Sequence, residues 1–68
     1  MRTFLDVLTL LKQYDIYIHL GNRLWDIELA AIEVDNLYQA SLIDAKKYAQ
    51  IKLVLQVEHE QEMKRQNL

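Results

Sequence analysis

The chain has 68 residues, no cysteine, no proline and one glycine, and 51% of its residues are hydrophobic. This length allows a single domain, and the lack of cysteine excludes disulfides and thiolate metal sites. Eight basic against ten acidic residues leave a net charge of −2, whereas duplex-binding modules normally carry a basic face. No apolar run approaches the ~18 residues that a membrane span needs, so we expect a soluble cytoplasmic protein without membrane contact.

The first segment predicts a helix from Thr3 to about Tyr14. Thr3 is a suitable N-cap, and the acidic Asp6 lies in the first turn, at the positive end of the helix dipole. The apolar positions form one continuous face, made of Phe4, Val7, Leu8, Leu10, Leu11 and Tyr14. We therefore expect an amphipathic helix with a single buried side.

Residues 15–20 change the period of the pattern. Ile16, Ile18 and Leu20 alternate with Tyr17 and His19, a period of two that is typical of extended chain. Two structures remain open at this point. The segment is either an extended or irregular connector with buried isoleucines, or a strand that pairs across a dimer axis.

The middle of the chain predicts a helix with apolar residues on two opposite sides. Gly21 stands where the chain must reverse, and Asn22 is the expected N-cap of a helix from about Arg23 to Ala40. At about 100° per residue, one broad stripe contains Leu24, Ile27, Ala30, Ala31, Val34 and Leu37. A second stripe, roughly opposite, contains Trp25, Leu29 and Ile32.

The last segment predicts a long helix that begins after Asp44, its expected N-cap, and runs from Ala45 to Met63 or beyond. Its main apolar face contains Tyr48, Ile51, Val54 and Leu55, and a thinner stripe contains Ala49, Leu53 and Val57. Residues 58–68 are almost entirely polar and are expected to form a solvated helical extension. The predicted fold is all-α, a small three-helix bundle with a long C-terminal helix, in one domain over residues 1–68.

The surplus apolar stripes predict association. A helix with two apolar stripes needs neighbours on both sides, and a chain below about 70–80 residues rarely builds a large core of its own. We therefore expect a homo-oligomer or a complex with an unidentified protein partner. The predicted interface contains Trp25, Leu29, Ile32, Leu53 and Val57.

The run from Ile18 to Glu28 has the pattern Ile-x-x-Gly-x-Arg-x-x-Asp-Ile-Glu, and on this run the chain resembles the YqgQ-like family of short bacterial proteins. The resemblance covers nearly the whole chain. Asp15 stands where the family more often has glycine, and His19 where it more often has tyrosine. The resemblance implies a compact three-helix fold, no assigned enzymatic activity, and binding of single-stranded nucleic acid.

The start of the middle helix is the one plausible site for such binding. Free amides after Asn22 lie at the positive end of the helix, Arg23 can grip a phosphate in two places, and aromatic rings can stack on bases. The candidate nucleic-acid-binding residues are Lys12, Tyr17, His19, Asn22, Arg23 and Trp25. The structural alternatives are that Gly21 only makes a turn, that Arg23 pairs with a nearby acid such as Asp26, and that Trp25 packs at an interface.

Metal binding and catalysis have little support in the sequence. His59 and Glu62 are three residues apart, but two ligands in a polar tail make a weak site. Ser41 is the only serine and has no histidine near it in the sequence. We therefore expect no metal, no cofactor and no enzymatic activity.

Overall fold

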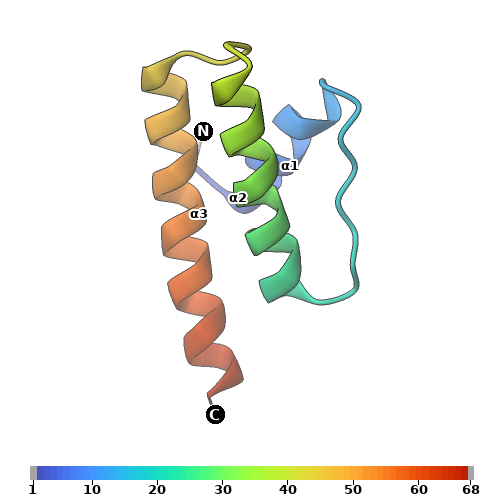
Figure 1. Ribbon diagram of the computed structural model, residues 1–68. Coiled ribbons are helices and arrows are strands. Elements are labelled where there is room, and N and C mark those ends of the chain that lie inside the picture. Colours follow the sequence, from blue (N-terminus) through green and yellow to red (C-terminus); the bar gives the residue numbers. More distant parts are fainter. Residues whose placement is uncertain (1, 68) are drawn as a thin grey trace.

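The computed structural model describes residues 2–67, which form three helices: α1 (Phe4–Lys12), α2 (Arg23–Gln39) and α3 (Ala45–Gln66). Helices α2 and α3 form an antiparallel hairpin, α1 packs against both of them, and an extended connector runs from the end of α1 to the start of α2 (Figure 1). No strand occurs in this part of the chain. The predicted all-α bundle with a long C-terminal helix is confirmed.

Each helix begins at the polar residue that the sequence predicted as its cap. The Thr3 hydroxyl accepts a hydrogen bond from the Asp6 amide, and the Asp6 carboxylate accepts one from the Thr3 amide in return, which is a capping box. The Asn22 side chain accepts a bond from the Trp25 amide. The first free amides of each helix are thus partly satisfied within the chain.

Helices α1 and α2 end in the same way, with one residue in the left-handed region. Asp15 has φ 60° and Ser41 has φ 62°. At each position the next amide reaches back five residues, from Ile16 to the Leu11 carbonyl and from Leu42 to the Leu37 carbonyl, both at 3.0 Å. These are Schellman-type ends, where glycine is the usual residue. Asp15 therefore occupies a site that glycine would fit without strain.

The hydrophobic core uses one face of every helix. The buried residues are Phe4, Val7, Leu11, Ile27, Ala30, Val34, Leu37, Ile43, Ile51 and Leu55. The main apolar faces predicted from helical spacing are therefore the faces that pack together. The second stripe of α2 is different: Trp25 and Ile32 are 57% and 56% exposed, and Leu29 is half-buried.

The connector over residues 16–20 is extended and unpaired within the described chain. Ile16 and Ile18 pack against the core, while Tyr17 is 70% exposed and His19 is also exposed. The two isoleucines and the exposed Tyr17 and His19 thus alternate as predicted, whereas Leu20, expected on the side of the isoleucines, is 51% exposed. Within one chain the segment is an extended connector, and pairing across a dimer axis stays a prediction. The Leu20 amide donates to the Asp26 carboxylate at 2.7 Å, which fixes the connector to the first turn of α2.

The C-terminal extension is helical to Gln66, but it is not fully solvated. Glu62 is 9% exposed, and Glu58 is half-buried. Both acids continue the three-and-four spacing of Ile51 and Leu55, so they face the start of α2, which lies beside this end of α3 (Figure 1). The positive end of α2 suits these carboxylates. Leu68 lies outside the described residues.

Candidate binding surfaces

The start of α2 uses its own polar groups locally. Gly21 has φ +83°, a left-handed conformation that favours glycine, and no atom lies within 4 Å of where its Cβ would be. Asn22 is the N-cap, and its side-chain oxygen lies 3.2 Å from the Trp25 amide nitrogen. The turn and cap roles expected for these two residues are therefore present, and one amide of the helix start is already bonded.

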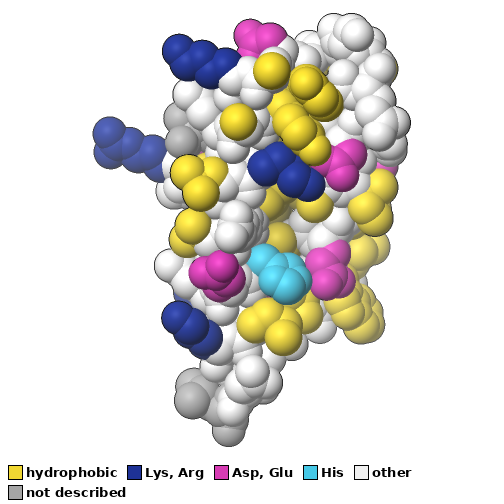
Figure 2. Space-filling view, turned by 60° about the vertical axis from the view of Figure 1, so that its left-hand side comes forward, with side chains coloured by type: hydrophobic (Ala, Val, Ile, Leu, Met, Phe, Trp, Pro, Cys, Tyr) yellow, Lys and Arg dark blue, Asp and Glu magenta, His cyan; other side chains and the backbone are white. Residues whose placement is uncertain are grey.

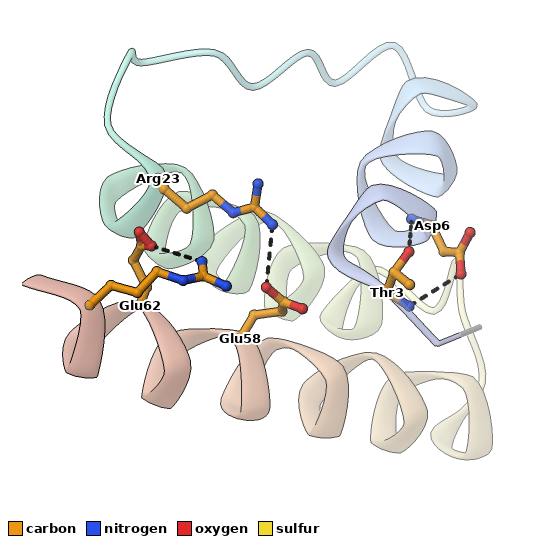
Figure 3. A network of polar contacts seen from close by, with 6 residues as sticks. Thr3, Asp6, Arg23, Glu58 and Glu62 are labelled. Carbon is orange, nitrogen blue, oxygen red and sulfur yellow. Dashed lines mark hydrogen bonds and ion pairs between the residues drawn. The ribbon is translucent and has the colours of Figure 1, made fainter.

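Arg23 joins the three helices. Its Nη2 atom lies 3.3 Å from Glu58 Oε2 on α3, and its guanidinium carbon lies 5.0 Å from the ring centre of Phe4 on α1. Figure 3 shows the side chain reaching across from α2 toward Glu58. The sequence anticipated an acidic partner for Arg23 and named Asp26, but Asp26 instead accepts from the Leu20 amide.

The other predicted nucleic-acid-binding residues do not all gather near Arg23. Tyr17 and His19 lie on the solvent side of the connector, and Trp25 is exposed in the first turn of α2. Lys12 is in the last turn of α1, at the opposite end of the connector (Figure 1). Five extended residues span about 16 Å, so Lys12 is separate from the group at the start of α2.

An apolar groove of about 600 Å³ lies between α2 and α3. We call it the α2–α3 groove. Its lining residues are Ile27, Glu28, Ala31, Ile32, Lys52, Leu55, Gln56 and His59. Figure 2 looks onto this side of the molecule, where hydrophobic side chains lie between charged ones. Two of its apolar lining residues, Ile27 and Leu55, belong to the buried core, whereas Ile32 is exposed.

Polar pairs cross the groove from one helix to the other. His59 Nε2 lies 3.3 Å from Glu28 Oε2, and Lys52 Nζ lies 3.0 Å from Asp35 Oδ1. The Tyr48 hydroxyl also donates to Asp35 Oδ1, at 2.7 Å. This bond, reinforced by Lys52, holds the pKa of the Asp35 carboxyl below its ordinary value and raises the pKa of Tyr48.

A second, smaller hollow of about 270 Å³ lies on another side of α3 and is lined by Arg2, Leu53, Val54, Val57 and Glu58. Leu53 is 62% exposed and Val57 is 44% exposed. The structure thus divides the predicted interface between two surfaces. Ile32 belongs to the α2–α3 groove, whereas Leu53 and Val57 belong to this second surface.

Several residues of these surfaces were not predicted as functional from the sequence, although the sequence pattern contains a signal for some of them. Glu58 and Glu62 occupy core-facing positions of α3, and an acid in such a register points to a basic or dipolar partner on a neighbouring helix. The stacked pair Tyr38 and Tyr48, with ring centres 4.2 Å apart, had no comparable local signal because it joins two helices. His59 contacts Glu28, and Glu62 pairs with Arg65, so these two positions do not act together.

These features define a small all-α protein of the three-helix class with exposed apolar surfaces on its hairpin. No helix within residues 2–67 combines the length and apolar composition needed to cross a membrane. The sequence matches the YqgQ-like family over residues 1–61, and the chain belongs to that family. It is 36% identical over 61 residues to the uncharacterized protein YqgQ of Bacillus subtilis (strain 168), an alignment that covers 90% of this chain and 86% of that protein.

Proposed function

We propose that this protein is a non-catalytic association module that binds another copy of the same chain through the α2–α3 groove. The observation that carries the proposal is that Ile32, which lines the groove next to the half-buried Ala31, is itself 56% exposed. A contiguous exposed apolar surface is typical of a protein contact site. Burial against another copy would remove that surface from water.

The size of the chain favours this partner. Small domains without disulfides or metals are commonly stabilised by oligomerisation, and 68 residues without cysteine fit that case. Each apolar side chain that becomes fully buried contributes about 1.5–3 kcal/mol. Covering Ile32 would therefore add materially to the stability of a fold of this size.

The proposal is tested by measuring mass in solution by sedimentation velocity over a dilution series. The wild-type chain is expected to associate as its concentration rises, and Ile32→Asp is expected to remain monomeric with its helicity intact by circular dichroism. Leu42→Asp is the matched control, because Leu42 is 54% exposed and lies outside the groove lining. A wild-type chain that stays monomeric throughout overturns the proposal.

A second candidate function is weak binding of single-stranded nucleic acid at the start of α2. The observation that favours it is the exposure of two aromatic side chains, Tyr17 on the connector and Trp25 in the first turn of α2, together with an arginine in the same turn whose side chain is 50% exposed. Base stacking on such rings contributes about 1–3 kcal/mol per base. The Arg23–Glu58 pair opposes it, because the guanidinium already has an anionic partner.

The test of this second candidate is titration of a fluorescently labelled single-stranded oligonucleotide at several salt concentrations. The expected signature is an affinity that falls with rising salt, because phosphate contacts release counterions. His19→Ala and Tyr17→Ala are expected to weaken binding, whereas Tyr38→Ala, on the other end of α2, is the control. Absence of binding at low salt removes this function.

A further inference from the structure

Resting on the proposed self-association through the groove, we infer that the connector, residues 16–20, makes a second contact between copies. Two connectors pair antiparallel about a two-fold axis and form a two-stranded β-ribbon. The contact uses backbone groups, as in the addition of an extended segment to an open sheet edge. The occupant of the open edge of one connector is therefore the connector of a second copy.

One edge of the connector faces the helices of its own chain. In extended chain, the N–H groups of successive residues point to opposite edges. The Ile16 amide donates to the Leu11 carbonyl at 3.0 Å, and the Leu20 amide donates to Asp26 at 2.7 Å. Both of these residues are even-numbered, so the backbone groups of the odd-numbered residues point to the other edge.

The other edge has backbone groups without partners. It presents the N–H and C=O groups of Tyr17 and His19, and within residues 2–67 neither residue makes a backbone hydrogen bond. The connector runs along the side of α2 that is remote from α3 (Figure 1). This edge is therefore free to accept a second strand.

The connector lacks the features that keep an open edge from pairing. Natural proteins block such edges with charged side chains, above all lysine, or with proline. Residues 16–20 have the sequence Ile-Tyr-Ile-His-Leu, without Asp, Glu, Lys, Arg or Pro. Isoleucine and tyrosine are also enriched in strands. The composition of the connector therefore suits a paired strand.

The exposed Leu20 indicates that the second strand is another connector. When the two-fold axis passes through Ile18, Leu20 of one copy lies across from Ile16 of the other. Leu20 is 51% exposed although the isoleucines pack against the core, and this contact would cover it. In the same register, Tyr17 and His19 of opposite strands exchange both of their backbone hydrogen bonds. One register thus satisfies the free backbone groups and covers the exposed leucine.

The groove and the connector lie on different sides of α2. Glu28 lines the groove, whereas Asp26, which holds the connector, lies roughly 160° away around the helix. The connectors therefore face away from a partner held at the groove, and they join one groove-held pair to the next. A single two-stranded ribbon is marginal in water, but a groove-held pair carries two connectors, which strengthens their binding.

Hydrogen exchange of the wild-type chain, measured by NMR at rising protein concentration, tests the pairing residue by residue. The amides of Tyr17 and His19 are expected to exchange about tenfold more slowly as the protein associates. The Ile18 amide lies on the other edge and is expected to keep the rate that it has in the dilute sample. Equal slowing of all three amides, or no slowing of Tyr17 and His19, overturns the inference.

His19→Pro removes one donor from the open edge, and proline is tolerated on an unpaired edge. His19→Ala is the matched control, because it keeps the amide. In sedimentation velocity, the wild type and His19→Ala are expected to exceed twice the monomer mass, whereas His19→Pro stops at twice the monomer mass. Circular dichroism checks that both variants keep wild-type helicity, and the exchange rates of the wild-type chain decide the question if His19→Pro does not.

The two contacts fail in different samples. If His19→Pro reaches the same mass as the wild type, connector pairing is wrong while association through the groove stands. If Ile32→Asp associates and its Tyr17 and His19 amides exchange slowly, connector pairing stands and the groove contact is wrong. If the wild-type chain stays monomeric, both fall.

Discussion

Arg23 Nη2 lies 3.3 Å from Glu58 Oε2, and this contact joins residues that are 35 positions apart in the chain. The same guanidinium lies over the ring of Phe4, so one side chain links α1, α2 and α3. The Glu58 side chain is only 19% exposed, whereas that of Arg23 is 50% exposed. The carboxylate is therefore the more buried member of the pair. The arginine at the start of α2 thus has a structural function that is complete within the single chain.

Replacing Arg23 by alanine is expected to lower the free energy of unfolding by about 1 kcal/mol. A partly exposed ion pair contributes about 0–1 kcal/mol, and a cation over an aromatic ring about 0.5–1 kcal/mol. Urea unfolding followed by circular dichroism measures the change. Arg65→Ala is the comparison, because it removes an arginine whose ion pair with Glu62 lies within α3 and links no second helix. Equal losses for the two variants would contradict a linking role for Arg23.

Replacing Glu58 by glutamine separates the structural from the nucleic-acid interpretation of Arg23. The amide keeps the shape of the side chain but removes the negative charge that the guanidinium now faces. If single-stranded nucleic acid binds at the start of α2, the affinity for a labelled oligonucleotide should rise in Glu58→Gln and fall in Arg23→Ala. An oligonucleotide affinity that is the same in both variants would show that Arg23 contacts no phosphate.

Ser41 is expected to be a site where glycine stabilises the fold. The left-handed conformation, with φ 62° at Ser41, costs a residue with a Cβ about 1–2 kcal/mol. Glycine avoids this steric cost, but it loses more backbone entropy on folding, so only part of the energy is recovered. We expect Ser41→Gly to raise the free energy of unfolding by about 0.5–1 kcal/mol and the melting temperature by several degrees. Ser41→Ala, which keeps the Cβ, should not. A drop in melting temperature for Ser41→Gly would show that the serine hydroxyl matters more than backbone strain.

Local features of this fold were predictable from the sequence because they depend on neighbours along the chain. Thr3, Asn22 and Asp44 cap the helices as their residue types predict, and the spacing of apolar residues identified the core faces. The strained ends at Asp15 and Ser41 were not identified from this sequence, because neither residue type demands a positive φ.

The contacts between helices were only partly predictable. Spacing shows that Leu53 and Ile32 lie on secondary stripes, but it does not say how the helices are rotated against each other. That rotation, set by the packing of the whole core, places the two residues on different surfaces. The pairing of Arg23 with Glu58 rather than with Asp26 has the same origin, because the antiparallel hairpin brings the end of α3 to the start of α2.

The Asp35 carboxyl makes the stability of the hairpin depend on pH in the acid range. Its pKa lies below 3.8 in the folded chain, mainly because the Tyr48 hydroxyl donates to it, with Lys52 adding to the effect. A group with a lowered pKa stabilises the fold fully above its unfolded value and loses this contribution as the pH falls through its folded value. We therefore expect the free energy of unfolding to decrease as the pH falls below about 3.8.

Replacing Tyr48 by phenylalanine should remove the largest cause of this pKa shift. The pKa of Asp35 should then rise toward 3.8 in an NMR titration of its carboxyl carbon, and stability should depend less steeply on pH in acid. Some acid sensitivity should remain, because backbone hydrogen bonds from Arg2 and Thr3 also lower the pKa of Asp6. Tyr38→Phe is the control, since it keeps the ring stacked on Tyr48 and leaves the bond from Tyr48 to Asp35 in place. If both variants shift the Asp35 titration equally, the hydrogen bond from Tyr48 is not the cause.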